Sequence, residues 1–205
     1  MADVAGTVTA VSAASVTLGD VAFACAWTVR GNPAQKAFIA EAETLFGLPL
    51  PLEPMTDARR GEHVVLWLGP RAWLYVTSSA PPQDDFNATR RALNAAGGAL
   101  FDVSASYVAW AIAGAAAGHV LNRSCPLDFN PRAFPAGHCA QSMLGHINAL
   151  VYRPDEQPRF IVMVARSLAA DAWDNLCTAA ATDGYRVVPP VPFASVAASS
   201  FPGRG

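Results

Sequence analysis

His63-Val-Val-Leu-Trp-Leu68 and Trp73-Leu-Tyr-Val-Thr77 are two apolar runs rich in β-branched and aromatic residues, and Gly69-Pro70 separates them. Runs of this length and composition, interrupted by glycine and proline, indicate two adjacent β-strands joined by a turn. Residues 84–96 then carry their apolar side chains at helical spacing and end at Gly97-Gly98. The stretch therefore predicts a strand–strand–helix unit.

The same order recurs in the second half of the chain. Residues 139–152 predict two strands with a turn near Gly145, and residues 159–165 predict one more strand. Ser167 is placed to begin a helix that ends by Gly184. Strand pairs followed by single helices, without strict strand–helix alternation, predict an α+β fold. We expect mixed, largely antiparallel sheets with packed helices and a weak internal duplication.

The remaining segments extend this pattern toward the N-terminus and the middle of the chain. Ser15 to Arg30 predicts two short strands around a Gly19-Asp20 turn. Asn32-Pro33 predicts the start of a helix that ends at Gly47, because Asn is a favoured N-cap and Pro suits the first helical position. Further strands are expected over 99–103 and 107–112, and a helix over 114–122.

The length allows one large domain with its own core, since 205 residues bury about 70% of their unfolded surface. We expect a single domain over residues 1–188, with an alternative division into two lobes near residues 98–105. Residues 189–205 are rich in Pro, Ala, Ser and Gly and predict a mobile C-terminal tail.

Charged residues form only 15% of the chain, against about 25% in ordinary soluble domains, and apolar residues form 52%. A surface so poor in charge is typical of a subunit that a partner covers. The net charge of −2 and the single lysine, Lys36, argue against nucleic acid as that partner. No apolar stretch is long enough for a membrane span and no leader is evident, so we expect a cytoplasmic protein with reduced cysteines.

The densest cluster of reactive residue types lies in Cys125-Pro-Leu-Asp-Phe-Asn-Pro-Arg-Ala-Phe-Pro-Ala-Gly-His-Cys-Ala-Gln141. A zinc set would consist of Cys125, His138, Cys139 and His146, but structural zinc ligands usually come in close pairs such as C-x2-C. Adjacent strand residues point to opposite faces, which separates His138 from Cys139. A cysteine nucleophile would need a base and an electropositive setting that adjacency alone does not supply. We interpret the stretch as a proline-pinned connection between a helix and a strand pair, with both cysteines buried.

Asp102 ends an apolar strand and is the weak candidate for cofactor binding, because a carboxylate there suits an amine or a pterin ring. The competing interpretation is that it caps the following turn through backbone contacts. Trp67, Arg71 and Trp73 are the candidates for partner contact, since tryptophan concentrates at interfaces and arginine beside aromatics suits partner recognition. For any single tryptophan, a place in the core is the favoured alternative.

Several segments together resemble the gamma subunit family of heterotetrameric sarcosine oxidase. The most specific is Cys-Pro-Leu-Asp with Phe-Pro-x-Gly-x-Cys-Ala-Gln, and coverage runs from about Ser15 to Pro190. The chain departs from the family pattern at Arg71-Ala72, Ala105-Ser106-Tyr107 and Ala115. The other matching segments are Thr28-Val29-Arg30-Gly31-Asn32 with Pro33, Gly47-Leu48-Pro49-Leu50-Pro51, Leu66-Trp67-Leu68-Gly69-Pro70 with Trp73-Leu74, Asp102-Val103-Ser104, Arg153, Phe160 and Arg166-Ser167.

The resemblance implies a fold related to the folate-binding domain of aminomethyltransferases and a non-catalytic structural role beside larger alpha and beta subunits and a small delta subunit. It implies oxidative demethylation of sarcosine to glycine on those partners, which hold FAD, FMN, NAD and tetrahydrofolate. It assigns no catalytic residue, cofactor or metal to this chain. The alternative is a stand-alone folate or one-carbon-binding protein, or an aminomethyltransferase-like enzyme, with a pocket around Asp102.

Overall fold

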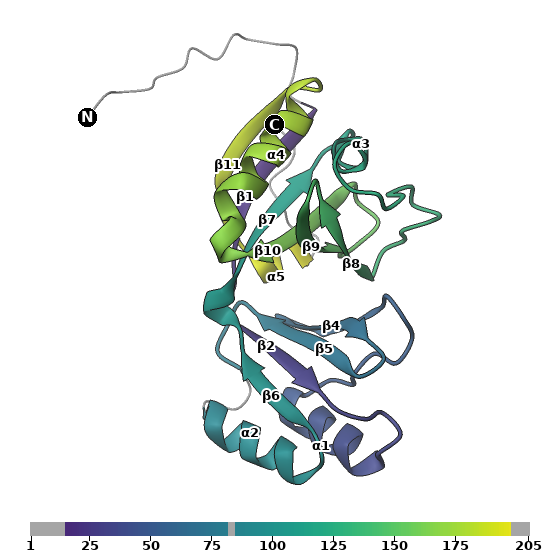
Figure 1. Ribbon diagram of the computed structural model, residues 1–205, viewed down its shortest axis with the longest axis vertical. Coiled ribbons are helices and arrows are strands. Elements are labelled where there is room, and N and C mark those ends of the chain that lie inside the picture. The colour runs from purple at the N-terminus through teal and green to yellow at the C-terminus, as the bar shows by residue number, and fades with distance from the viewer. Residues whose placement is uncertain (1–14, 82–84, 198–205) are drawn as a thin grey trace, which may run out of the picture.

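The computed structural model describes residues 15–81 and 85–197, and it consists of four layers (Figure 1). Two β-sheets face one another at the centre, and each sheet is covered on its outer face by helices. The predicted α+β class with largely antiparallel sheets is confirmed.

The lower sheet in Figure 1 has the strand order β3-β4-β5-β2-β6 and is antiparallel throughout. Helices α1 and α2 cover its outer face. The elements are β2 (Cys25–Arg30), α1 (Lys36–Phe46), β3 (Asp57–Arg60), β4 (His63–Gly69), β5 (Ala72–Thr77), α2 (Phe86–Ala95) and β6 (Ala99–Asp102).

The upper sheet has the order β11-β1-β7-β10-β9-β8, in which β1 and β11 are parallel and the other neighbours are antiparallel. Helices α3 and α4 cover its outer face. The elements are β1 (Val16–Ala22), β7 (Tyr107–Ala113), α3 (Ala117–Asn122), β8 (His138–Leu144), β9 (Ile147–Arg153), β10 (Arg159–Ala165), α4 (Ala169–Ala181), β11 (Tyr185–Pro192) and α5 (Phe193–Ala197).

The two halves of the chain repeat one topology, which extends the recurrence seen in the sequence. The first half runs β2-α1-β3-β4-β5-α2-β6 and the second β7-α3-β8-β9-β10-α4-β11. Their strand orders correspond position by position, except that β1 is inserted between β7 and β11. The last strand of each half runs antiparallel to its first, because β11 is parallel to β1 and β1 is antiparallel to β7.

Three apolar clusters hold the layers together. The first joins α3 and α4 to the upper sheet, and the third joins α1 and α2 to the lower sheet around buried Phe38, Trp73 and Tyr75. The second lies between the sheets, where Val64, Leu74 and Val76 of the lower sheet meet Leu150, Tyr152 and Ile161 of the upper one, among others. Both sheets therefore bury apolar side chains on both faces.

Two predictions about the N-terminal third are wrong. Gly19-Asp20 lies inside β1 and is no turn, because Gly19 packs against β11 so closely that a Cβ there would stand 2.6 Å from Val188. The strands β1 and β2 belong to different sheets. The first helix begins at Lys36, three residues after Pro33, since Asn32 Oδ1 accepts from the Ala34 N–H in a local turn. Its predicted end is confirmed by Gly47, which has a φ of 70°.

The predicted mobile tail is wrong for residues 189–197. Residues 189–192 form part of β11, and Phe193 of α5 is fully buried between the sheets and stacks on Tyr152 at 6.2 Å between ring centroids. Residues 198–205 lie outside the described residues. The strand β3, which no periodicity in the sequence indicated, is paired along its length with β4.

The substitution Phe193→Ala is expected to lower the free energy of unfolding by about 3–5 kcal/mol, because it empties a buried aromatic site between the sheets. Leu52→Ala is the matched control, since Leu52 is 60% exposed and its loss should cost within about 0.5 kcal/mol. Urea unfolding of both variants measures the difference. Equal stabilities would show that α5 contributes nothing to the inter-sheet core.

Candidate functional site

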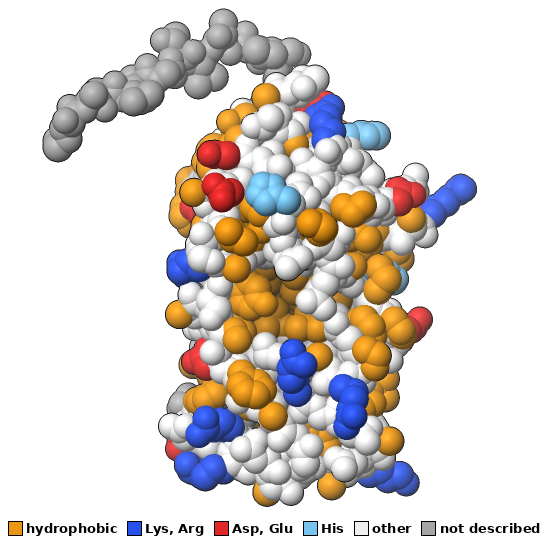
Figure 2. Space-filling view, viewed as in Figure 1, with side chains coloured by type: hydrophobic (Ala, Val, Ile, Leu, Met, Phe, Trp, Pro, Cys, Tyr) orange, Lys and Arg blue, Asp and Glu red, His pale blue; other side chains and the backbone are white. Residues whose placement is uncertain are grey.

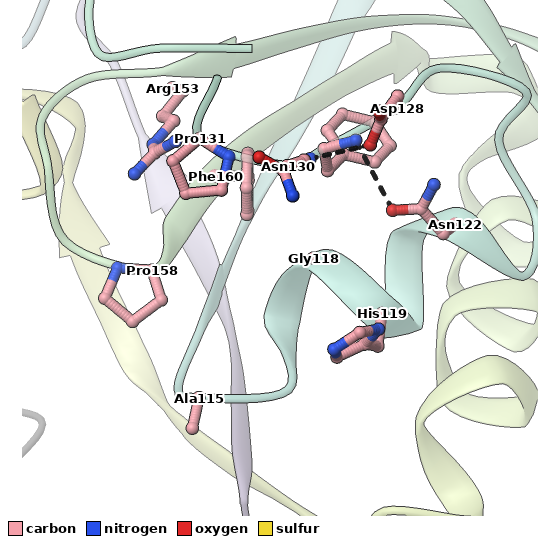
Figure 3. Close-up of a pocket in the computed structure, with 11 residues that line it drawn as sticks. Ala115, Gly118, His119, Asn122, Asp128, Asn130, Pro131, Arg153, Pro158 and Phe160 are labelled. Atoms are coloured by element: carbon pink, nitrogen blue, oxygen red, sulfur yellow. Dashed lines mark hydrogen bonds between the residues drawn. The ribbon is translucent and has the colours of Figure 1, made fainter. Parts of the chain in front are cut away.

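Residues 125–137 of the Cys125–Gln141 stretch form a loop between α3 and β8, and residues 138–141 begin β8. A cavity of about 380 Å³ lies between this loop and α3 (Figure 3). Helix α3 supplies Gly118, His119 and Asn122 to its wall, and the loop supplies residues 128–131. Phe160 and the buried Arg153 close the side of the upper sheet. The cavity therefore lies beside the stretch that holds the densest cluster of potentially reactive residues in the sequence.

Four polar side chains around this cavity, those of Asn122, Asp128, Asn130 and Arg153, are engaged in fixing the loop. Asn122 donates to the Leu127 carbonyl over 2.9 Å and accepts from the Phe129 N–H. Asp128 Oδ1 accepts from the Asn130 N–H at 2.9 Å, and Asn130 Oδ1 accepts from the Arg132 N–H at 3.0 Å. The Asp128 and Asn130 bonds form turns in which a side chain bonds the backbone two residues on, and Asn122 ties α3 to the loop. The cavity therefore offers the shape of a pocket without a convergent set of free polar groups.

Arg153, at the end of β9, anchors the same loop to the upper sheet. Its guanidinium donates to the carbonyls of Phe134, Asp155 and Glu156, and it is 2% exposed. The side chain also lies over the Phe160 ring at 5.9 Å. Three backbone carbonyls use most of its donors, so Arg153 acts as a structural clamp between the loop and β9.

The two cysteines of the stretch are buried in different cores. Cys125 belongs to the cluster under α3 and α4, and Cys139 to the cluster between the sheets. Cys139 Sγ contacts the carbonyls of Thr56 and Trp67 at 3.5 and 3.4 Å, and burial raises the pKa of its thiol to about 12. His138 points the other way and packs edge-on against Phe134. The structure thus separates the residues that a zinc or thiolate site would join.

Asp102 caps the crossover from the lower to the upper sheet. Its Oδ1 accepts from the Ser104 N–H at 2.9 Å and from the Ser104 hydroxyl at 2.5 Å. The Ser104 hydroxyl oxygen in turn accepts from the Ala26 N–H on β2. The carboxylate is engaged in the turn, which matches the competing interpretation of this residue.

The three partner-contact candidates lie in different environments. Trp73 is fully buried and its indole N–H donates to the Pro51 carbonyl at 2.7 Å, so its assignment as a partner contact is wrong. The α1 helix covers that face of β5, and Phe38 of α1 contacts the ring. Trp67 is half-buried, and Arg71 is exposed at the turn between β4 and β5.

Sequence reasoning missed a buried polar cluster beneath β3. The Asp57 carboxylate accepts from the Tyr152 hydroxyl at 2.5 Å, across the boundary between the two sheets. Burial raises the pKa of Asp57, while Tyr152 and Arg59 oppose that rise. Burial and the nearby carboxylate raise the pKa of Tyr152 well above its ordinary value. Since β3 was not predicted, no signal in the sequence brought Asp57 near Tyr152.

The other hollowed surface is the inter-sheet groove, which we define by two neighbouring cavities of about 520 and 440 Å³ that share Gln141. The larger is lined from the upper sheet by Tyr107, Met143, Leu150 and Met163 and others. The smaller is lined from the lower sheet by Arg30 and by the β4–β5 turn with Arg71. Figure 2 shows a hollow lined by hydrophobic side chains at the level where the sheets face one another, with Lys or Arg side chains below it.

Comparison with known proteins connects this fold to one enzyme complex. Residues 30–182 match the "Sarcosine oxidase, gamma subunit" family. The chain is 35% identical over 153 residues to the sarcosine oxidase subunit gamma of Corynebacterium sp. strain P-1, covering 74% of this chain and 73% of the relative. It is 33% identical over 153 residues to the protein of the same name from Arthrobacter sp., with the same coverage.

Solved structures give the same result at the level of the fold. A chain of the heterotetrameric sarcosine oxidase from Corynebacterium sp. U-96, in complex with pyrrole 2-carboxylate, superposes with a TM-score of 0.74 and 28% identity over 87% of this chain and 90% of that one. The glycine cleavage system aminomethyltransferase T of Bartonella henselae matches with a TM-score of 0.56 and 13% identity, over 85% of this chain and 48% of that one. The second match concerns the fold alone.

The native protein is expected to resist alkylation at Cys139 and Cys25, because burial raises the pKa of each thiol to about 12 and little thiolate exists at pH 8. Half-buried Cys177 should react first with iodoacetamide. Mass spectrometry of the digested protein identifies the labelled sites. Rapid labelling of Cys139 in the folded protein would restore the nucleophile interpretation.

The stability of the protein is expected to fall as pH rises above about 4, in the range where Asp57 ionises in the folded state. Asp57 keeps its proton to higher pH in the folded state than in the unfolded chain, where its pKa is about 3.8. The free energy of unfolding therefore declines as pH rises from the unfolded-state pKa to the higher folded-state pKa of Asp57. Asp57→Asn should remove that part of the decline and keep the contact with Tyr152. Asp20→Asn, at an exposed position, is the control. Urea unfolding at a series of pH values tests this, and parallel curves for all three proteins would refute it.

Proposed function

The chain belongs to the sarcosine oxidase gamma subunit family, and from this we propose that it is a non-catalytic structural subunit of a sarcosine oxidase-type complex. In such a complex, sarcosine is oxidatively demethylated to glycine on partner subunits. The observation that carries the proposal is the superposition of 87% of this chain on 90% of a chain in a heterotetrameric sarcosine oxidase, with a TM-score of 0.74.

The chemistry of the chain's own residues supports a structural role. The polar groups around the loop cavity form turns, Arg153 holds three carbonyls, and Asp102 caps the crossover. The reactive thiols that the sequence suggested are buried, with the pKa of Cys139 far above neutral pH. Asp102, Arg153 and Cys139, which the sequence singled out, are thus engaged in holding the fold.

The partners follow from the family. We place larger alpha and beta subunits and a small delta subunit around this chain, and we assign FAD, FMN, NAD and tetrahydrofolate to those partners. No helix within residues 15–81 and 85–197 is both long and apolar enough to cross a membrane. We propose the cytoplasm as the location of the complex, in keeping with the four free cysteines.

The alternative of a stand-alone folate-binding protein is less well supported. It requires a pocket with convergent polar groups around Asp102. None of the three cavities of about 380, 520 and 440 Å³ is lined by Asp102, and its carboxylate accepts two bonds from Ser104. The likeness to aminomethyltransferase T, at 13% identity, concerns the fold alone.

Affinity purification of this chain after co-expression with the neighbouring open reading frames is expected to yield a yellow complex that bears flavin and oxidises sarcosine. The isolated chain should be colourless and inactive, and it should not bind tetrahydrofolate. Absorbance at flavin wavelengths and the conversion of sarcosine to glycine measure the first result, and calorimetric titration measures the second. A chain that emerges alone and binds tetrahydrofolate tightly would contradict the proposal.

A further inference from the structure

The two central sheets pack closely at one end and leave a gap at the other. On the lower sheet, Ala26, Thr28 and Arg30 alternate onto the face toward the upper sheet, because residues two apart on a strand share a face. Ala26 is buried in the inter-sheet core, Thr28 is half-buried and Arg30 is exposed. Burial therefore decreases steadily along this face toward Arg30.

The upper sheet shows the same gradient on the facing side. Tyr152 is fully buried, Leu150 is 6% exposed and lines the groove, and Asn148 is exposed. Their β8 neighbours across the sheet are Cys139, Gln141 and Met143, of which Met143 is 41% exposed. The inter-sheet groove is thus the open end of the core between the sheets.

Gln141 marks the boundary between the packed and the open part. Its amide nitrogen donates to the Leu68 carbonyl over 2.7 Å and so bridges β8 to β4. Beyond it, the described residues that line the larger cavity all come from the upper sheet. The wall includes Met143, which is 41% exposed, beside the buried Leu150 and Met163 and the polar Ser142 and Asn148.

The charged residues that line the groove, Arg30 and Arg71, are both positive. Arg30 lines it from the end of β2 and Arg71 from the β4–β5 turn. Arg30 lies opposite Ala72, and the Gly31 N–H donates to the Arg71 carbonyl. Both are exposed, and neither side chain forms an ion pair or a hydrogen bond with a described residue. No residue lining either cavity is Asp or Glu.

We propose that the inter-sheet groove binds a short segment of a larger partner subunit that carries apolar side chains and at least one carboxylate. The apolar side chains lie against Met143 and Leu150, and the carboxylate pairs with Arg30 and Arg71. Arginine suits this pairing because its planar guanidinium binds a carboxylate through two parallel bonds. The inference rests on the proposed function, because it assigns the surface by which the subunit joins its complex.

The dimensions of the groove fit a short extended segment. Its upper wall crosses four neighbouring strands, β7, β10, β9 and β8. Strands lie about 4.8 Å apart, so four of them span roughly 14 Å, which an extended chain covers in about four or five residues at about 3.3 Å each. A contact of this size is one part of a subunit interface, whose standard area is about 800 Å² per partner.

The test is co-purification of the complex with charge-reversed subunits. Arg30→Glu with Arg71→Glu is expected to lower the yield of partner subunits at least tenfold, and Met143→Glu is expected to lower it severalfold. The matched controls are Arg132→Glu with Arg186→Glu, which reverse two exposed arginines outside the groove, and Leu168→Glu, since Leu168 is 38% exposed away from it. Circular dichroism melting of each isolated variant verifies folding.

The outcomes separate this inference from the proposed function. If the wild-type chain recovers no partner subunits, the proposed function fails and the groove with it. If the wild type and the groove variants recover partners equally, the groove assignment alone is overturned. A groove variant that melts early is replaced by Arg71→Ala alone, for which a threefold or larger loss is expected and an unchanged yield would count against the proposal.

A photocrosslinker identifies the occupant directly. With p-benzoylphenylalanine in place of Met143, irradiation of the purified complex should join this chain to a segment of a larger subunit that contains Asp or Glu. Crosslinks confined to residues 1–14 or 198–205 of the same chain, or to a second copy of it, would overturn the proposal.

Discussion

Burial between the two sheets is the interaction on which the rest of the structure depends. Each sheet has apolar residues on both faces, and the cluster that includes Leu74, Tyr152 and Ile161 covers one face of each with the other. Helices then need to cover only the outer faces, which α1 to α4 do. A fully buried aromatic or branched aliphatic side chain contributes about 1.5–3 kcal/mol, and the shared core contains several of them.

Two elements outside the repeated topology, β1 and α5, contribute side chains to the core between the sheets. Both halves place their hairpins, β4-β5 and β9-β10, in corresponding positions. The second half also accepts β1 between β7 and β11, which widens the upper sheet to six strands against five below. Helix α5 inserts Phe193 and Val196 into the inter-sheet core, while Arg30 and Met143 remain at its open end. The closed end of the inter-sheet core stabilises the fold, and we infer that the open end binds a partner.

Local patterns in the sequence predicted much of the fold and little of the candidate surface. The strand pair around Gly69-Pro70, the strand over Arg159–Ala165 and the helix end at Gly47 follow from periodicity and turn chemistry, which local sequence encodes. The strand β11 escaped prediction because Pro189 and Pro190 argue against a strand, yet an edge strand needs fewer N–H donors. Trp73 was misassigned because its neighbours in sequence do not reveal that α1 covers it. The groove depends on how the two facing sheets diverge, and these sheets are built from segments far apart in the sequence. A local sequence pattern therefore does not predict it.

If the chain acts only through contacts with its partners, assembly should change its hydrogen exchange only at the residues that the partners contact. Hydrogen–deuterium exchange of the free chain and of the chain in the purified complex measures this directly. Docking through the groove predicts slowed exchange at Arg30, at the Leu68–Ala72 turn and near Met143, with the loop cavity around Asn122 and Phe129 unchanged. Protection confined to that cavity, with unchanged exchange at the groove, would contradict the assignment of the groove as the docking surface.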